Sequence, residues 1–254
     1  WDAGSARLLA HLGFEALATT SAGFAFSLGR PDGIGHISRA EALAHARDIV
    51  AATPLPVSAD LENGYGDAPE TVAETVRQAA QAGLCGCTIE DTTGDDDSPI
   101  YDFSLAVERI SAAVEAAGNV PGGFVLTARS ENFLHGRPDL ADTIARLQAF
   151  EAAGAHVLYA PGLPDLASMR AVVEATSKPV NVVMGLAGSS ITLADLTEIG
   201  IARVSTGSAL ARAALGEFLR AAREIRQTGT FEFSAQAATF TTLNEIFSGK
   251  KSIE

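Results

Sequence analysis

The chain has 254 residues, enough for one large α/β domain or two small ones. A hydrophobic content of 47% with a positive mean hydropathy excludes a disordered polypeptide. A formal net charge of −13 without any basic cluster argues against a nucleic-acid partner, and no apolar run approaches the roughly 20 residues that span a membrane.

The first residues and the two cysteines indicate where the natural protein begins and in which compartment it is found. The chain opens at Trp1 and enters a helical pattern at once, so we expect the natural protein to begin before this residue. No signal peptide is visible. Cys85 and Cys87 are too close in sequence for an ordinary disulfide bond, which favours a reducing compartment such as the cytoplasm.

An internal repeat organises the chain. Three segments, which begin near residues 71, 141 and 192, combine a stretch of helical period with a glycine, a short apolar run and a polar or glycine-rich loop. A glycine directly after a helix is a common stop signal, and short apolar runs of this kind are typical of parallel sheets covered by helices. The pattern predicts seven strands, near residues 15–20, 56–60, 85–90, 124–129, 156–160, 179–184 and 202–206.

Helices are expected in most of the gaps between these strands. Residues 2–14 have a helical pattern, and Asp67, Pro69 and Glu70 together predict the start of a helix. Beyond the last strand, residues 231–247 predict one or two further helices.

Seven strands fit two architectures. An eight-stranded (β/α)₈ TIM barrel needs one more strand, which would lie just before Trp1. A doubly wound open sheet is the competing fold, but no G-x-G-x-x-G motif opens a helix after the early strands. We therefore predict an α/β barrel, with residues 1–228 as the catalytic domain and 229–254 as a C-terminal helical extension of it.

In such a barrel, the chemistry lies where the strands end and the following loops begin. Acidic residues follow three successive strands, an arginine ends the fourth, and the sixth carries Asn181. The charged residues at this rim are Asp32, Asp60, Glu62, Glu90, Asp91 and Arg129.

Carboxylates held this close repel one another unless a proton or a cation neutralises them. Oxygen ligands without histidine or thiolate suit Mg²⁺, with Mn²⁺ as an alternative, and the planar guanidinium of Arg129 suits a carboxylate or a phosphonate. The competing interpretation is salt-bridged strand ends or solvated loop charge. It fits Asp91 and residues 95–97, which we expect to be solvated, better than it fits Asp60, Glu62, Glu90 and Arg129 together.

Other catalytic classes find less support. The five histidines lack metal-ligand spacing, and no G-x-S-x-G or Cys–His pattern indicates a hydrolase triad. Lys178 precedes a strand at the wrong end, and Lys250 and Lys251 lie in the tail, which excludes a Schiff-base aldolase. If Glu90 points into the barrel, Cys85 and Cys87 point outward and pack against helices instead of binding a metal.

These residues resemble the isocitrate lyase/phosphoenolpyruvate mutase superfamily, including its 2-methylisocitrate lyase-like and carboxyphosphonoenolpyruvate phosphonomutase-like members. WDAGSARLLAHLGFEALATTSAG resembles the family's opening after its first strand, and SADLENGYGD resembles its D-x-D-x-G-Y-G metal motif. TIED, TARSENF, GAHVLYAPG and KPVNVV follow in the expected order. The resemblance covers nearly the whole chain and implies a barrel whose final helix swaps between subunits of a homodimer or homotetramer.

The resemblance also implies roles for individual residues. Arg129 would bind the substrate and support the developing enolate, with Asp32 and Glu90 as further catalytic residues. The substrate-binding residues would be Ser21, Ala22, Gly23 and Asn181, the first three as a backbone cradle for a 2-oxo acid. The Mg²⁺ shell, direct or through water, would be Asp32, Asp60, Glu62 and Glu90.

Two departures from the family affect the predicted reaction. Family lyases carry K-K-C-G-H in the loop after the third strand, and phosphonate-active members carry lysine and asparagine there, whereas this chain has TTGDDDSPIYDF. Glu62 also replaces the motif's usual aspartate. We predict a Mg²⁺-dependent lyase or decarboxylase that cleaves a C–C bond of a small, oxaloacetate-like 2-oxo dicarboxylate through an enolpyruvate intermediate. The alternatives are a phosphonate-acting mutase or hydrolase and a catalytically silent 2-oxo acid binding protein.

Overall fold

The computed structural model describes residues 1–186, 188 and 190–249. Seven parallel strands form one sheet in sequence order, and each lies within its predicted range. The strands are β1 (Leu17–Ala18), β2 (Val57–Asp60), β3 (Gly86–Glu90), β4 (Val125–Arg129), β5 (Val157–Tyr159), β6 (Val180–Val183) and β7 (Arg203–Ser205).

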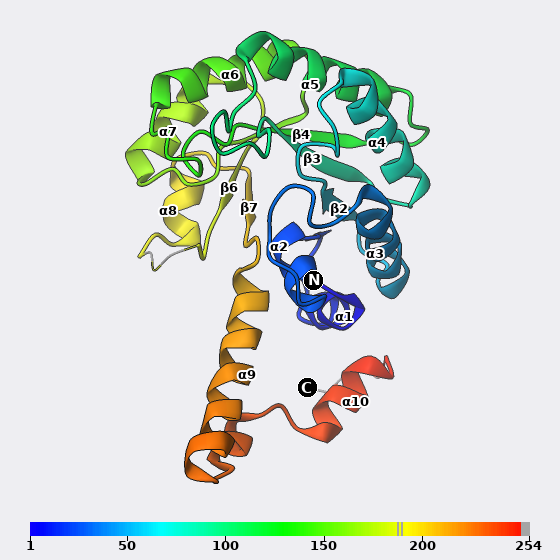
Figure 1. Ribbon diagram of the computed structural model, residues 1–254, viewed down its shortest axis with the longest axis vertical. Helices are drawn as coiled ribbons and strands as arrows, with labels where there is room; N and C mark the ends of the chain where they lie inside the picture. Colours follow the sequence, from blue (N-terminus) through cyan, green and yellow to red (C-terminus); the bar gives the residue numbers. More distant parts are fainter. Residues whose placement is uncertain (187, 189, 250–254) are drawn as a thin grey trace.

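The sheet curls into a nearly closed barrel with helices around it (Figure 1). Its strand order runs from β1 to β7 without a reversal, so the doubly wound alternative is wrong and the barrel prediction is confirmed. In the described part of the chain, β1 pairs only with β2 and β7 only with β6, so these strands are the two edges. The eighth strand expected before Trp1 stays a prediction.

Most helices connect successive strands along the outside of the barrel (Figure 1). They are α3 (Arg39–Ala52), α4 (Pro69–Gln81), α5 (Phe103–Gly118), α6 (Leu140–Ala152), α7 (Leu166–Ala175) and α8 (Leu193–Glu198). In addition, α1 (Ala3–His11) precedes β1, and the short helix α2 (Ser21–Ser27) follows β1 directly. The last elements are α9 (Ala209–Thr228), the 3₁₀ helix η1 (Glu232–Gln236) and α10 (Phe240–Phe247). No helix among the described residues has both the length and the apolar character needed to cross a membrane.

The C-terminal elements leave the barrel. Figure 1 shows α9 projecting away from it, and α10 turns back toward α1. There the Arg7 side chain donates a hydrogen bond of 2.5 Å to the carbonyl oxygen of Phe247 and lies over its ring. The helices expected within residues 231–247 are therefore confirmed, whereas 250–254, with Lys250 and Lys251, lie outside the described residues.

Side chains alternate along each strand between the barrel interior and the helical layer. Ala59, Cys87 and Leu126 face the helices and are buried in the main hydrophobic core. Cys87 therefore has the predicted packing role, but Cys85 is exposed, so the prediction that both cysteines pack against helices is wrong for Cys85. The other set of positions faces the interior and places polar side chains there.

The predicted start of α4 needs one correction. The helix begins at Pro69 with Ala68 as its N-cap, and no side chain caps it. Asp67 instead accepts a hydrogen bond of 2.5 Å from the Tyr101 hydroxyl. Glu70 lies in the first turn as predicted, where the helix dipole stabilises a negatively charged side chain.

Candidate active site

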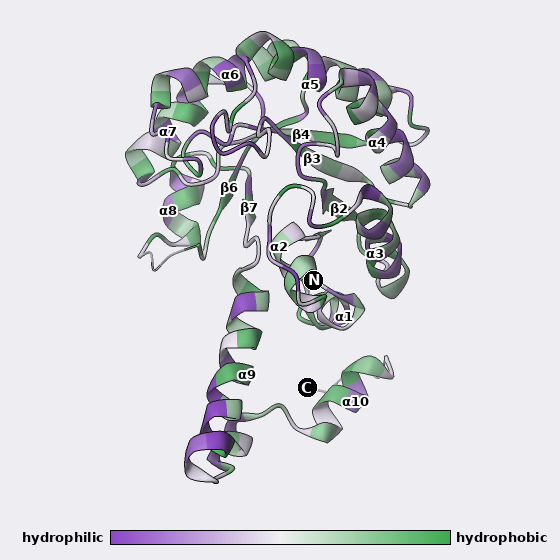
Figure 2. Ribbon diagram, in the orientation of Figure 1, coloured by the Kyte–Doolittle hydropathy of each residue, from purple (hydrophilic) through white to green (hydrophobic). Residues whose placement is uncertain are grey.

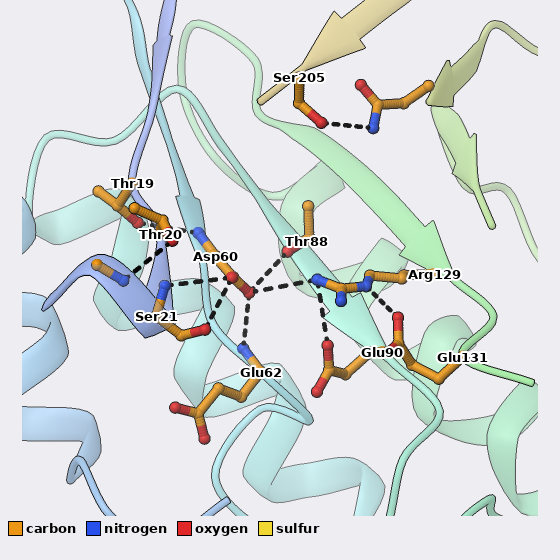
Figure 3. Close-up of polar contacts among 12 residues, drawn as sticks. Thr19, Thr20, Ser21, Asp60, Glu62, Thr88, Glu90, Arg129, Glu131 and Ser205 are labelled. Atoms are coloured by element: carbon orange, nitrogen blue, oxygen red, sulfur yellow. Dashed lines mark hydrogen bonds and ion pairs between the residues drawn. The ribbon is translucent and has the colours of Figure 1, made fainter. Parts of the chain in front are cut away.

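The carboxyl ends of β2, β3 and β4 bring three predicted residues together in the mouth of the barrel (Figure 3). The Arg129 Nη1 atom lies 3.3 Å from Glu90 Oε2 and 3.8 Å from Asp60 Oδ1. Because Arg129 stands on β4 and Asp60 on β2, this contact crosses β3 through the barrel interior. The predicted convergence of Asp60, Glu90 and Arg129 is confirmed.

Two further residues that the sequence analysis did not single out complete the surroundings of Arg129. Its Nε atom donates to Glu131 Oε1, and its guanidinium lies 5.0 Å from the centre of the Tyr159 ring. Burial alone would lower the pKa of this guanidinium, but the carboxylates around it, with Glu131 foremost, raise it well above its usual value. Arg129 is therefore a permanently charged guanidinium whose position is fixed by the carboxylates around it.

Asp60 is held by the segment that follows β1. Its Oδ2 atom accepts hydrogen bonds from the Ser21 amide at 3.3 Å and the Ser21 hydroxyl at 3.1 Å. Its own amide donates to the Thr19 hydroxyl at 3.0 Å, and Thr88 donates to Oδ1 at 3.4 Å. Both carboxylate oxygens therefore have fixed directions (Figure 3).

The expected 2-oxo acid cradle, Ser21 to Gly23, forms the first turn of α2 beside Asp60. Thr20 caps this helix by accepting a hydrogen bond from the Gly23 amide at 3.2 Å. A Cβ atom on Gly23 would lie 2.6 Å from Thr20 Cγ2 and 2.9 Å from Trp1 Cβ, so only glycine fits here. Two of the three cradle amides have partners within the protein, namely those of Ser21 and Gly23.

Glu62 lies just beyond β2 in a strained backbone conformation. Its φ angle of 49° is in the left-handed region, which non-glycine residues rarely adopt. The side chain is buried, and its Oε2 atom has no hydrogen-bond partner among the described residues. Burial, followed by the charges of Asp60 and Asp32, raises the pKa of Glu62 to about 8.

Asp32 and Glu90 share this tendency to hold a proton. Asp32 is exposed as a residue, but desolvation and then the charge of Asp60 raise the pKa of its carboxyl, which therefore faces the mouth. Burial raises the pKa of Glu90 well above its usual value, against the opposing effect of Arg129. Carboxyl groups that favour protonation next to one another indicate a site with too little positive charge.

The residues fit a hydrated divalent cation. In the ranges that the structure covers, no three acidic, histidine or cysteine side chains stand close enough to hold a metal by themselves. Mg²⁺, however, usually keeps several waters and needs one or two carboxylates. Among the described residues, the buried Oε2 atom of Glu62 has no hydrogen-bond partner. A hydrated cation held between Glu62 and Asp60 would give this oxygen the partner it lacks.

Asn181 lies in a separate polar network on the opposite side of the interior. Its side-chain amide donates to the Ser205 hydroxyl at 3.1 Å, and its Oδ1 atom accepts from Arg203 Nε at 2.9 Å. Arg203 also donates to the Thr127 hydroxyl at 2.8 Å. The predicted substrate-binding residue therefore faces the interior but contacts Arg203, which sequence reasoning did not identify, and not Arg129.

The loop after β3 closes on itself. Thr92 and Ile100 form an antiparallel bridge, and the Thr93 amide donates to the carbonyl of Pro99 at 2.9 Å. Residues 95–97 at its tip are exposed, as expected. Asp91 is not solvated, contrary to the prediction, because Arg146 Nη1 lies 3.2 Å from its buried carboxylate.

A cavity of about 500 Å³ opens next to the mouth, between the loop after α2, the loop after β2 and the start of the β3 loop. Ile37 and Tyr65 line it and also line a small void beside Asp60 and Glu62. Asp60, Glu62, Glu90 and Arg129 do not line the larger cavity, and the void beside Asp60 and Glu62 measures only about 10 Å³. Ile37 and Tyr65 therefore lie between the larger cavity and the carboxylates.

Comparisons with known proteins agree with this geometry. A family model described as phosphoenolpyruvate phosphomutase matches residues 1–226. The chain belongs to this family. The resemblance to the isocitrate lyase/phosphoenolpyruvate mutase superfamily is thereby confirmed, and with it the assignment to a family of C–C lyases and mutases.

Relatives of this family member include enzymes and uncharacterised proteins. An oxaloacetate decarboxylase of Paraburkholderia xenovorans is 34% identical over 217 residues, covering 82% of this chain and 69% of the relative. The 2-methylisocitrate lyase of Escherichia coli is 30% identical over 267 residues, covering 97% and 84%. An uncharacterised protein of Mycobacterium tuberculosis is 34% identical over 227 residues, covering 89% and 82%.

Solved structures superpose closely on the family member. A Burkholderia cenocepacia J2315 protein, described only as a lyase/mutase, has a TM-score of 0.95 and 60% identity over 98% of this chain and 88% of its own. An oxaloacetate acetylhydrolase solved with its product oxalate has a TM-score of 0.87 and 26% identity over 100% and 89%.

Proposed function

We propose that the protein is a Mg²⁺-dependent lyase or decarboxylase that cleaves a C–C bond of an oxaloacetate-like 2-oxo dicarboxylate. The observation that carries the proposal is the fixed pairing of Arg129 with carboxylates around the partnerless Glu62 oxygen. The similarity to an oxaloacetate decarboxylase and to an oxaloacetate acetylhydrolase supports the choice of substrate class.

Each group in the mouth has a role in this reaction. The Arg129 guanidinium would bind a substrate carboxylate and stabilise the negative charge that develops as the C–C bond breaks. Ser21 to Gly23 would orient the 2-oxo acid end, as in the resemblance described above. Asp60 and Glu62, with Asp32 and Glu90 through water, would hold Mg²⁺, which supplies Lewis-acid stabilisation of the enolate oxygen.

The closed loop after β3 favours a reaction that needs no acid from that loop. Its residues 92–102 contain no lysine, cysteine or histidine, and the bridge between Thr92 and Ile100 shortens its reach over the mouth. Loss of CO₂ from a 2-oxo dicarboxylate leaves an enolate that the metal and Arg129 can stabilise without a loop acid. Decarboxylation or hydrolysis therefore fits this chain better than the cleavage of isocitrate or methylisocitrate.

The test is turnover of oxaloacetate to pyruvate by the purified protein, with and without EDTA. We expect turnover that EDTA abolishes and that Mg²⁺ restores, after subtraction of the spontaneous metal-catalysed reaction. Undiminished turnover in EDTA would refute the metal-dependent mechanism. A parallel panel with phosphonopyruvate and 2-hydroxytricarboxylates tests the phosphonate and lyase alternatives, and calorimetric oxalate binding without any turnover would identify a silent binding protein.

We also propose a homodimer or homotetramer in which the C-terminal helices pack on a neighbouring subunit. Figure 2 colours the hydrophobic residues of these helices green. Several of them are exposed, with Phe218 at 69% and Phe240 at 85%. Exposed apolar faces of this kind mark interfaces. Light scattering should give a multiple of 26.2 kDa, and Phe218→Asp should lower the mass whereas Arg223→Ala on the same helix should not. A monomeric natural protein would refute the proposal.

The free cysteines support a cytoplasmic location, because reduced thiols persist in that compartment. Fractionation of the source cells with an antibody against the protein would test this placement.

A further inference from the structure

The loop between β2 and α4, residues 61–68, is held in an unfavourable backbone conformation. Two of its non-glycine residues have positive φ angles, 49° at Glu62 and 63° at Tyr65. Such conformations persist only where surrounding contacts impose them. Glu62 is also the carboxylate whose oxygen lacks a partner, so the contacts that impose the conformation decide where this carboxylate points.

Arg109 on α5 supplies three of these contacts. Its side chain is only 1% exposed, and it donates to three carbonyl oxygens of the loop. Nη1 donates to Gly66 and Asp67, both at 2.6 Å, and Nη2 donates to Asn63. Among the residues that the structure describes, no carboxylate forms a direct ion pair with Arg109. Its guanidinium contacts the loop carbonyls and the Tyr101 ring, 4.1 Å away, while Asp67 and Asp91 act on its charge from a greater distance.

Tyr101 reinforces the same loop from the other side of the guanidinium. Its hydroxyl donates to Asp67 Oδ1 at 2.5 Å and accepts from the Asn63 amide at 3.3 Å. Asn63 directly follows Glu62, so both its backbone carbonyl and its side chain are fixed by this pair. Arg109 and Tyr101 together form what we call the loop anchor.

We propose that the loop anchor positions the metal site, with Arg109 as a positioning residue that acts on the cation through Glu62. The proposal rests on the Mg²⁺ site of the proposed function and assigns part of its affinity to a residue that touches neither metal nor substrate. Groups that orient metal ligands typically change metal affinity by about 10–100-fold when they are removed. A planar guanidinium suits this role because its fork of donors spans several carbonyls, which the single ammonium of lysine cannot do.

A purely structural role for Arg109 would predict a different outcome. In that case its replacement would lower stability, while the folded fraction would bind metal as before. Ile110 offers a matched comparison, since it is the next residue on α5, is 2% exposed, lies in the hydrophobic core, and has an aliphatic side chain that cannot donate a hydrogen bond to the loop carbonyls. Ile110→Ala should therefore reduce stability without changing metal affinity.

The experiment measures Mn²⁺ binding to the full-length protein by electron paramagnetic resonance of free Mn²⁺, with the folded fraction followed by circular dichroism. We expect Arg109→Lys to weaken Mn²⁺ binding at least about tenfold. Tyr101→Phe, which keeps the ring and the fold, should weaken it about threefold. Ile110→Ala should bind as the natural protein does, and the KM for oxaloacetate at saturating Mn²⁺ should change less than twofold in every variant.

The outcomes separate this inference from the proposed function. Arg109→Lys and Tyr101→Phe proteins that bind Mn²⁺ within twofold of the natural protein would overturn the role of the loop anchor alone. If Arg109→Lys does not fold, Tyr101→Phe decides by the same criterion. A natural protein that binds no Mn²⁺ would overturn the proposed metal site itself, and the inference with it.

Discussion

The raised pKa of Glu62 predicts that the EDTA-treated protein loses stability as the pH rises. The carboxyl has a pKa of about 8 in the folded protein and about 4.5 when unfolded, so between these values the folded state holds a proton that the unfolded state has released. Stability therefore falls with increasing pH, since the unfolded state binds fewer protons. The stabilising contribution is complete below pH 4.5 and is lost as the pH approaches 8.

The size of the effect follows from the displacement of the pKa. Each pKa unit corresponds to about 1.36 kcal/mol, so a rise from 4.5 to about 8 corresponds to about 5 kcal/mol. Solvent near the mouth screens the neighbouring charges, and we expect about half of this value, about 2.5 kcal/mol. A contribution of this size corresponds to a displacement of about two pKa units, so about 1 kcal/mol of it falls between pH 5.5 and pH 8.5.

Urea unfolding at these two pH values, with EDTA, measures the change. Glu62→Gln removes the titration of this carboxyl, so between the two pH values its free energy of unfolding should fall by about 1 kcal/mol less than that of the natural protein. The comparison with Glu62→Gln is needed because the pKa of Glu90 is also raised, so the stability of both proteins should fall with increasing pH. At pH 8.5, Mg²⁺ should restore stability to the natural protein but much less to Glu62→Gln. Parallel pH profiles for the two proteins would refute the reasoning.

Three further predictions address the substrate arginine, the α2 turn and a buried ion pair. Arg129→Lys should lower kcat/KM for oxaloacetate about 100-fold or more in steady-state assays, because a lysine cannot reproduce the guanidinium fork. Gly23→Ala should reduce the free energy of unfolding by about 1–3 kcal/mol in urea, since the new Cβ meets Thr20 at 2.6 Å. Arg146→Met should cost about 3–5 kcal/mol in the same assay, because it leaves Asp91 buried without its partner.

Arg77 provides a control for the Arg146 variant, because its ion pair is exposed. Arg77→Met removes an exposed pair with Glu74 and should change stability by less than about 0.5 kcal/mol. An Arg129→Lys enzyme with unchanged kcat/KM would remove Arg129 from the mechanism. A fully stable Gly23→Ala protein would show that the α2 turn can move, and a stable Arg146→Met protein would show that Asp91 finds another partner or a proton.

The barrel could be predicted because its strands are buried on both faces. Each strand therefore reads as a short apolar run that leads into a polar or glycine-rich loop, and all seven lie within their predicted ranges. The start of α4 was harder, since Asp67 has the chemistry of a helix cap but is engaged by Tyr101, 34 residues away. The prediction that Asp91 is solvated is wrong for the same reason, namely that its ion-pair partner Arg146 is far away in sequence, on α6.

The candidate site could be predicted only in part. Residues that end strands, such as Asp60, Glu90 and Arg129, follow from the barrel geometry. The supporting arginine on α5 was not recognised, although Arg109 shares a helix face with the buried Ala106 and Ala113, and a charge on an apolar stripe is a usable signal. Long-range hydrogen bonds to backbone carbonyls leave no such pattern in a single sequence.

The mouth contains more carboxylates than guanidinium groups, and this excess affects the order in which the cation and the substrate bind. A dianion approaching the carboxylates around Arg129 alone would be repelled by the surrounding field. In the proposed metal-dependent reaction, productive encounters would then require that the cation enters first, or that it enters already chelated by the 2-oxo acid. Kinetics of this kind would make turnover follow the free magnesium concentration, and no excess of substrate would compensate for its loss.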